Sequence, residues 1–407
     1  MGHINVGDTA FMLICSALVA IMTPGLGFFY GGLVRHKNVI TIMMQSFISF
    51  GIVSAIWVLF GFSLAFGNDH AGLIGSFQYV LLHNVGQLPN PHYGATIPFL
   101  AFFVFQLTVA ALTPALITGA FADRLSFFGY VKFLALWSIL VYVPLAHWIW
   151  GGGFLAKWGV VDFGGGMVVH ASAGFAALAS VFAIKKRVFA EGEKDAPSNI
   201  PLIAIGLALL WFGWLGDNPA GALGANGVAT QAFVNTFMAG GLAMGMWLII
   251  DCVRTGKASM IGALTGVLAG LVAVTPCAGY VPTWAACLIS IIAGAVCYVA
   301  VQFRAKRGWD DSLDVWGVHG VGGVLGSLLV GVFSFASVDH VNGLLAGNVK
   351  QFGLQCAGVA IVMAYTFAVT FGIFKVLDLR QTLYVPRQVQ LKGLDAELHG
   401  ETAYDLS

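Results

Sequence analysis

Charged residues are scarce in this sequence. Asp, Glu, Lys and Arg together make up only 9% of its 407 residues, whereas a soluble domain carries roughly 25%. The chain therefore cannot cover itself with an ordinary water-facing surface, and a soluble globular fold is excluded. Its net charge of +1 also argues against a nucleic-acid surface or a strongly charged cleft for an acidic substrate.

The usual signatures of disulfides, metal sites and nucleotide sites are lacking too. The six cysteines lie in or beside apolar segments and form no C-x-x-C pair, so we interpret them as small hydrophobic residues. There is no Walker loop or kinase motif, and the glycine runs have no strand before them, which argues against phosphate loops. We expect neither an enzyme nor a bound cofactor or metal.

Hydrophobic residues, in contrast, make up 58% of the chain. Apolar runs close to the roughly 20 residues that cross a bilayer recur along the whole length. The first run lacks a basic segment before it and a clean cleavage site, so we interpret it as a membrane span and not as a signal peptide. The pattern predicts an all-α integral membrane protein with about eleven transmembrane helices, which begin near Phe11, Ile40, Ile97, Phe127, Val168, Pro201, Phe233, Met260, Thr283, Val318 and Phe352.

Lysine and arginine are unevenly divided between the two sets of loops. Only Lys157 and Lys350 lie in the loops after the even-numbered helices. All other lysines and arginines lie in the set of loops after the odd-numbered helices. They are Arg35, Lys37, Arg124, Lys132, Lys185, Lys186, Arg187, Lys194, Arg254, Lys257, Arg304, Lys306, Arg307, Lys375, Arg380, Arg387 and Lys392. Since basic loops face the cytoplasm, we expect the N-terminus outside and the C-terminus inside. We predict a membrane domain over residues 1–379 and a cytoplasmic tail over residues 380–407.

Two segments that lie five predicted helices apart resemble each other. DFGGGMVVH (162–170) and DVWGVHG (314–320) each place an aspartate, Asp162 or Asp314, just before a glycine-rich helix start with a histidine in its first turns. Because five spans separate them, the two copies enter the membrane from opposite sides. This predicts a five-plus-five inverted repeat followed by a final helix, with the substrate site at the repeat interface near the membrane midplane.

His170 and His319, the histidines of this repeat, are the strongest candidates for chemistry. A full charge inside a membrane span costs roughly 2.5–3.5 kcal/mol, but imidazole can stay neutral and either donate or accept a hydrogen bond. Two such rings side by side would share a proton, which suits a substrate that loses and regains a proton while crossing. The alternative is two separate packing histidines with backbone partners. A metal site is disfavoured because no third ligand occurs at helical spacing.

Seven segments are similar to the ammonium transporter (Amt/Mep/Rh) family, in family order over nearly the whole chain. They are FQLTVAALTPALITGAFADR (105–124), AHWIWGGG (146–153), DFGGGMVVHASAG (162–174), GWLGDNPAGALGANG (213–227), VTPCAGY (274–280), DDSLDVWGVHGVGGVLG (310–326) and GLDAELHGETAY (393–404). The resemblance implies eleven helices, a homotrimer in the bacterial cytoplasmic membrane, and a narrow pore for ammonium or ammonia in each subunit. It also implies that His170 and His319 are the paired pore histidines.

The resemblance implies roles for four further residues. Phe105 and Trp150 match the outer vestibule, where an aromatic face can hold a cation; the alternative for Trp150 is an interfacial tryptophan. Asp162 matches the aspartate that supports the outer site, and it can at the same time be a helix N-cap. Trp214 matches a pore-lining tryptophan beside the histidines, with core packing as the alternative.

Three positions depart from the family pattern at the pore mouth. Val109 and Asp217 stand where two phenylalanines usually form a stacked gate, and Gly221 stands where a serine is usual. A carboxylate 4 Å from a cation gains about 4 kcal/mol at an effective dielectric of 20. Conduction needs binding weak enough to let the ion leave, so such a site favours sensing over flux. The alternative is that Asp217 is solvated and only attracts cations. The tail departs as well, with Tyr384 and Gln388 in stretches usually rich in Arg and Glu.

The sequence thus predicts recognition of ammonium or ammonia and its transport through a twin-histidine pore. The alternative is an ammonium sensor on the same fold with little or no conduction. Its output would then come from a fused signalling domain beyond Ser407 or from a partner, such as a PII-type regulator at the cytoplasmic face.

Overall fold

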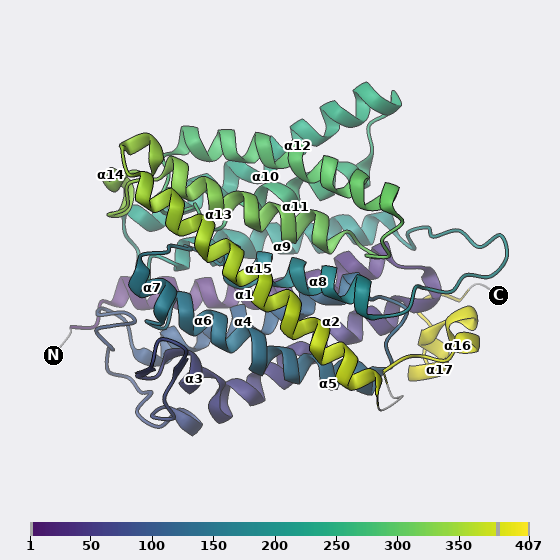
Figure 1. Cartoon of the computed structure of the whole chain (residues 1–407), viewed down its shortest axis with the longest axis horizontal. Helices are drawn as coiled ribbons and strands as arrows, with labels where there is room; N and C mark the ends of the chain where they lie inside the picture. The colour runs from purple at the N-terminus through teal and green to yellow at the C-terminus, as the bar shows by residue number, and fades with distance from the viewer. Residues whose placement is uncertain (1–2, 380–382, 406–407) are drawn as a thin grey trace.

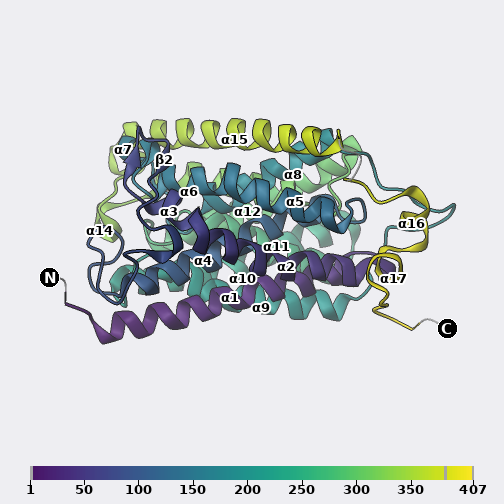
Figure 2. The same cartoon turned by 90° about the horizontal axis from the view of Figure 1, so that it is seen from below.

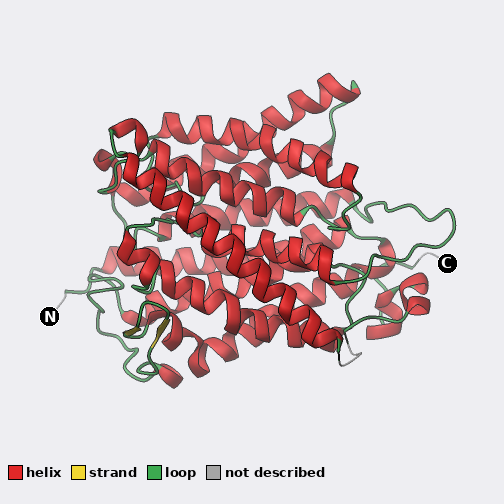
Figure 3. Ribbon diagram, in the orientation of Figure 1, coloured by secondary structure: helices red, strands yellow, loops and turns green. Residues whose placement is uncertain are grey.

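The computed structural model describes residues 3–379 and 383–405, which are almost entirely helical (Figures 1 and 3). Arg380 and Ser407, which enter the sequence predictions above, lie outside these residues. Strands β1 (Asp69–His70) and β2 (Ile74–Gly75) form a two-stranded antiparallel ribbon within a loop. This helical architecture confirms the predicted fold class.

Ten segments of the described chain are long and apolar enough to cross a membrane, and one shorter apolar helix completes the eleven that the sequence predicts. In chain order they are α1 (Val6–Leu33); α2 (Val39–Ile56) with η2 (Trp57–Gly61) and α3 (Phe62–Phe66); α4 (Phe99–Ile117); α5 (Phe127–Trp137) with η5 (Ser138–Tyr142), α6 (Val143–Ile149) and α7 (Phe154–Trp158); η6 (Gly166–Ala171) with α8 (Ser172–Ala183); α9 (Ile200–Ala220); α10 (Gly227–Thr255); the shorter α11 (Met260–Val274); α12 (Thr283–Arg307); η7 (Trp316–Gly320) with α13 (Val321–Phe333); and α15 (Val349–Asp378).

Two helices begin five or six residues earlier than the apolar pattern suggests. α1 starts at Val6 and not near Phe11, and α10 starts at Gly227 and not near Phe233. In each case an asparagine precedes the helix, and its side chain accepts a hydrogen bond from a main-chain N–H in the first turn. These N-caps satisfy helix-start donors, so the polar cap and not the first apolar residue sets the helix start.

The helices form one bundle whose two chain ends lie at opposite ends (Figure 1). Seen from below, α15 covers one side of the bundle, while α1 and α9, which pack along each other, lie on the other side (Figure 2). An odd number of crossings separates the chain ends in this way. Short helices α16 (Arg387–Lys392) and α17 (Leu394–His399) lie beyond the spans at the C-terminal end.

The C-terminal segment is tied to that end of the bundle. The Asp395 carboxylate in α17 accepts hydrogen bonds from the main-chain N–H groups of Ile40 and Thr41, at 2.9 and 2.8 Å. It thereby caps the start of α2, which leaves such donors free. The main chain of Val385 also donates to the carbonyl of Arg124. The segment therefore packs on the bundle through specific contacts.

Glycines let the two repeat helices cross in direct backbone contact. A Cβ on Gly174 in α8 would overlap the backbone of Gly320 in η7. A Cβ on Gly323 in α13 would lie 2.7 Å from the main-chain nitrogen of Ala171 in η6. Small residues at such crossings allow close helix packing in membranes. This paired contact sets the distance between the two helix starts that carry the histidines.

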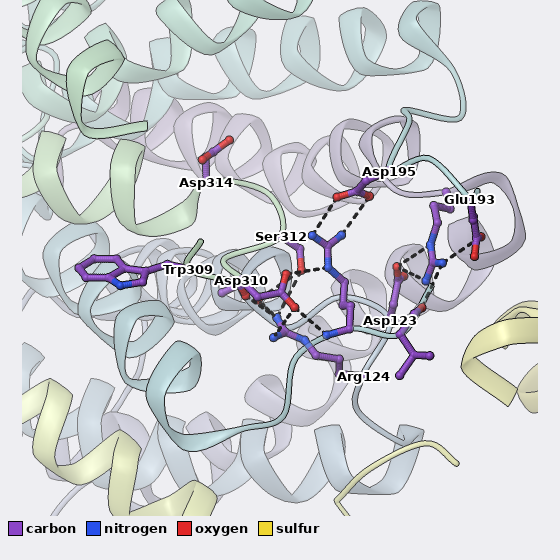
Figure 4. Close-up of polar contacts among 12 residues, drawn as sticks. Asp123, Arg124, Glu193, Asp195, Trp309, Asp310, Ser312 and Asp314 are labelled. Atoms are coloured by element: carbon purple, nitrogen blue, oxygen red, sulfur yellow. Dashed lines mark hydrogen bonds and ion pairs between the residues drawn. The ribbon is translucent and has the colours of Figure 1, made fainter. Parts of the chain in front are cut away.

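Asp310 joins two buried arginines at the C-terminal end of the bundle (Figure 4). It pairs with Arg187 at 2.8 Å and with Arg124 at 3.3 Å, and both arginine side chains are almost completely buried. Burial alone would raise the pKa of Asp310, but the two arginines outweigh it and hold the pKa below its usual value. Arg187 also pairs with Asp195 at 2.9 Å. These pairs connect the loops before η7, after α4 and after α8.

A second group of ion pairs ties the loop after α8 to the start of α2. Arg35 pairs with Asp123 and with Glu193, each at 2.9 Å, and Lys37 pairs with Glu193 at 2.6 Å. Burial would raise the pKa of Glu193, but its hydrogen bonds and the neighbouring positive charges lower it to about 2. Because this value lies below the ordinary 4.5, the stabilisation is present at neutral pH and is lost as the pH falls from about 4.5 towards about 2.

We expect Gly174→Ala to destabilise the protein, because its new methyl group would overlap the Gly320 backbone. Overpacking of this kind costs about 1–3 kcal/mol or more. Gly372→Ala in α15 is the matched control, since a Cβ there meets nothing within 4 Å. Thermal unfolding in detergent should show a lower Tm for Gly174→Ala alone. Equal Tm values for both variants would contradict the crossing described here.

The ion pairs of Arg187 allow a second matched comparison. Asp310→Asn removes the carboxylate that two buried arginines share, and breaking a buried pair costs about 3–5 kcal/mol. Asp195→Asn removes a partner whose side chain is 46% exposed, and such surface pairs contribute about 0–1 kcal/mol. The Tm should therefore fall clearly for Asp310→Asn and little for Asp195→Asn. A larger fall for Asp195→Asn would show that burial does not determine the strength of this network.

Candidate functional site

His170 and His319 are in direct contact in the centre of the repeat. Their Nδ1 atoms lie 3.2 Å apart, and the ring centroids are 5.3 Å apart with 27° between the planes. Both side chains are buried. A hydrogen bond between the two Nδ1 atoms needs one donor and one acceptor, so a single shared proton satisfies the pair. The structure thus brings the two histidines together, and they are partners of each other and not two separate packing residues.

The Asp162 carboxylate holds the helix start that carries His170. Its two oxygens accept hydrogen bonds of 2.6 to 3.1 Å from four successive main-chain N–H groups, those of Gly165, Gly166, Met167 and Val168. A helix start leaves such donors without partners, and a negative charge there is favoured by the helix dipole. Asp162 is therefore an N-cap. Its link to the outer site is indirect, since the Trp150 indole N–H donates to its main-chain carbonyl at 2.8 Å.

Asp311 has the equivalent role in the second repeat. Its carboxylate accepts from the N–H groups of Val315 and Trp316, at 3.1 and 2.7 Å. His319 follows Asp311 at the same spacing in the sequence as His170 follows Asp162. In both copies the histidine lies in a π-helical turn, η6 or η7, and such turns are frequent at functional sites.

The choice of Asp314 as the counterpart of Asp162 was therefore wrong. Asp314 has a φ of +59° and matches Gly165, whose φ is +106°. Its carboxylate pairs with Arg304 at 2.6 Å and does not cap the helix. The sequence pattern misled because both aspartates precede the second histidine, and only the backbone geometry separates the cap from the left-handed turn residue.

A cavity of about 240 Å³ opens towards the N-terminal end of the bundle. We call it the outer cavity, because the sequence predicts that this end faces outside. It is lined by five of the residues that the sequence analysis selects, Phe105, Val109, Trp150, Asp217 and Gly221. The predicted vestibule residues thus share one space, and Asp162 lies outside its lining.

Gly221 and the outer loop complete this cavity. A Cβ on Gly221 would lie 2.9 Å from the ring of Phe163, which also lines the cavity, so the aromatic ring occupies the space that a larger residue would need. His92 and Tyr93 contribute from the loop before α4. The sequence analysis missed both, because a loop of irregular structure carries no periodic signal that predicts where it folds.

Asp217 is a buried carboxylate without a partner. Its side chain lines the outer cavity, and the residue is 7% exposed. Among residues 3–379 and 383–405, none donates a hydrogen bond to it or forms an ion pair with it. An unpaired buried charge costs several kcal/mol. A cation in the outer cavity would supply the missing partner.

Trp214 lies beside His170, on the same helix as Asp217. Its indole N–H donates to the hydroxyl of Thr275 at 2.9 Å, and its ring lies 5.2 Å from that of His170. Trp214 and Asp217 are three residues apart on α9, so they share a helix face. The tryptophan is therefore well positioned beside the histidine pair.

A second cavity, of about 170 Å³, lies on the other side of the pair, and we call it the inner cavity. His319 lines it together with Tyr30, Asp195 and Asp314. The Nε2 atom of His319 is buried and has no hydrogen-bond partner among the described residues. Tyr30 and Asp195 were not selected from the sequence, because they lie far from the histidines in the chain.

Comparison with known proteins gives consistent results. The model of the Ammonium Transporter Family matches residues 10–404. The chain is 43% identical to an ammonium transporter of Bacillus subtilis, over 98% of this chain and 99% of that protein. It is 44% identical to ammonium transporter Amt1 of Archaeoglobus fulgidus, with the same two coverages.

Solved structures share the fold. Mep2 of Saccharomyces cerevisiae is 31% identical with a TM-score of 0.88, covering 95% of this chain and 89% of that one. A structure named "Sensor Amt Protein" is 27% identical with a TM-score of 0.88, covering 97% and 98%. The apolar helices of the present chain make it a multi-pass membrane protein. The family match over nearly its whole length shows that this chain belongs to the ammonium transporter family.

Proposed function

We propose that this protein transports ammonium across the cell membrane along a path from the outer cavity, past Trp214 and the histidine pair, to the inner cavity. The observation that carries the proposal is the hydrogen-bonded pair of His170 and His319 between two cavities. Membership of the ammonium transporter family supports the substrate.

Each part of the path has a stated role. The faces of Phe105 and Trp150 and the carboxylate of Asp217 attract the cation in the outer cavity, where an aromatic face can replace part of its water shell. The ammonium ion gives one proton to water in the outer cavity before it reaches the buried histidines, because a full charge is costly there. The neutral imidazoles then offer polar contacts to ammonia, which takes up a proton from water in the inner cavity.

We further propose the orientation and assembly that the sequence predicts. The end with the C-terminus and the paired Arg35, Arg124 and Arg187 faces the cytoplasm, as basic segments do. The membrane domain comprises residues 1–379, and the tail comprises residues 380–407. A homotrimer and a PII-type regulator at the cytoplasmic face remain predictions from the family resemblance.

A second candidate function is an ammonium sensor with little or no conduction. Asp217 favours it, because a carboxylate in place of a gate phenylalanine holds a cation tightly and slows its release. The structural neighbour named "Sensor Amt Protein" has the same fold over 98% of its length. A sensor of this kind needs a signalling domain beyond Ser407 or a partner protein.

The two candidates are separated by transport assays on the original protein and on Asp217→Phe combined with Val109→Phe. Removing the carboxylate should weaken ammonium binding by up to about a thousandfold, the upper limit from about 4 kcal/mol at 1.4 kcal/mol per decade. Turnover should rise, because the ion then leaves more easily. Val109→Phe alone is the control, because it adds an aromatic ring and keeps the Asp217 carboxylate.

Uptake into liposomes at matched protein density and calorimetry on the folded proteins give the result. Transport requires that the original protein takes up ammonium faster than protein-free liposomes. If the original protein binds ammonium without taking it up, while the double variant does take it up, the sensor function would replace the transporter function. Equal affinity and equal uptake of the two would reduce Asp217 to a solvated vestibule residue.

A further inference from the structure

Asp217 differs in its surroundings from four other buried carboxylates of this chain. Asp162 and Asp311 accept hydrogen bonds from helix starts, Asp395 accepts them from α2, and Asp123 pairs with Arg35. Each of these contacts stabilises the ionised form. Asp217 has no such contact among the residues that the structure describes, although its exposed fraction is only 7%.

The groups that face Asp217 offer no compensating positive charge from the bundle. Cys15 in α1 and Tyr142 in η5 are near enough to interact with it electrostatically, and both are neutral in their ordinary forms. In the outer cavity the titratable neighbours are His92 and Tyr93, and no lysine or arginine is among the described residues of its lining. Among the described residues of the lining, His92 is therefore the one group that could balance the charge of Asp217, and otherwise a cation from solution must do so.

Burial without a partner favours the neutral form of a carboxyl group. An ammonium ion in the cavity reverses this preference, because an opposite charge nearby favours the carboxylate. The ion also donates N–H bonds to the carboxylate oxygens, which are stronger than neutral hydrogen bonds.

We propose that ammonium binding in the outer cavity displaces a proton from Asp217. The O–H bond of the neutral carboxyl group breaks, the carboxylate pairs with the ammonium ion, and the proton leaves through the cavity to the outer water. One positive charge enters as one leaves, so the empty and occupied sites carry the same net charge. This inference rests on the proposed function, which assigns ammonium to the outer cavity, and it adds that the site is an exchanger of ammonium for a proton.

The exchange makes a quantitative prediction about pH. As long as Asp217 is protonated in the empty protein, each unit of pH should strengthen apparent ammonium affinity about tenfold, since one proton is released per ion bound. The dependence should level off once the empty site is ionised. Between about pH 5 and about pH 8 the ligand itself stays almost entirely protonated, so it does not contribute to this trend.

Isothermal titration calorimetry with ammonium chloride on the purified full chain tests the exchange. Titrations at several pH values in phosphate and in Tris, which differ in protonation enthalpy, give the number of protons released. We expect about one proton per ammonium ion at the acidic end and none from Asp217→Asn, which should also bind more weakly and with little pH dependence. Size-exclusion chromatography checks that the variant is folded.

His92→Gln identifies the source of the proton. Release should persist in this variant if Asp217 is the source; its loss there, or its persistence in Asp217→Asn, would overturn the proposal. The exchange would also be overturned if the original protein binds ammonium without releasing a proton and with an affinity that does not change with pH. That result would still support an ammonium site in the outer cavity. A complete lack of ammonium binding would instead remove the outer site, and the exchange with it.

Discussion

The architecture depends on two carboxylates that cap helices inside the bundle. Asp162 and Asp311 accept hydrogen bonds from main-chain N–H groups that would otherwise be unsatisfied where water is excluded. In a membrane each such group costs several kcal/mol. Because both caps are supplied from within the chain, two helices can begin within the bundle and each can carry a histidine towards its centre.

The caps and the glycine contacts together determine the geometry of the pair. Each cap sets the start of its helix, and the crossing at Gly174 and Gly323 sets how closely the two helices approach. The 3.2 Å between the Nδ1 atoms of His170 and His319 follows from both. Arg35, Arg124 and Arg187 at the C-terminal end are balanced by ion pairs, whereas Asp217 in the outer cavity is left without a partner from the described chain. A cationic substrate can provide the positive charge that Asp217 lacks.

Much of this was predictable from sequence, and the failures have physical causes. Apolar length reveals spans, and an aspartate before a glycine-rich helix start with a histidine in its first turns reveals the inverted repeat, because both are local patterns. The pattern could not separate Asp311 from Asp314, since the distinction lies in a left-handed backbone turn at Asp314. It also could not assign His92 to the outer cavity or Asp195 to the inner one, because loop folding joins residues without sequence periodicity. Family resemblance identified Val109 and Asp217 as unusual, but the lack of a partner for Asp217 needed the structure.

The central claim is that the substrate passes the His170 and His319 pair as ammonia. The most direct measurement compares ammonium uptake into liposomes by the original protein with uptake by His170→Ala and His319→Ala at matched density, with binding measured on the same preparations. The account predicts that either variant loses most of the uptake, or passes the intact ammonium ion with its charge in place of ammonia, while ammonium still binds in the outer cavity. Uptake that keeps the same rate and the same charge per ammonium in both variants would contradict it.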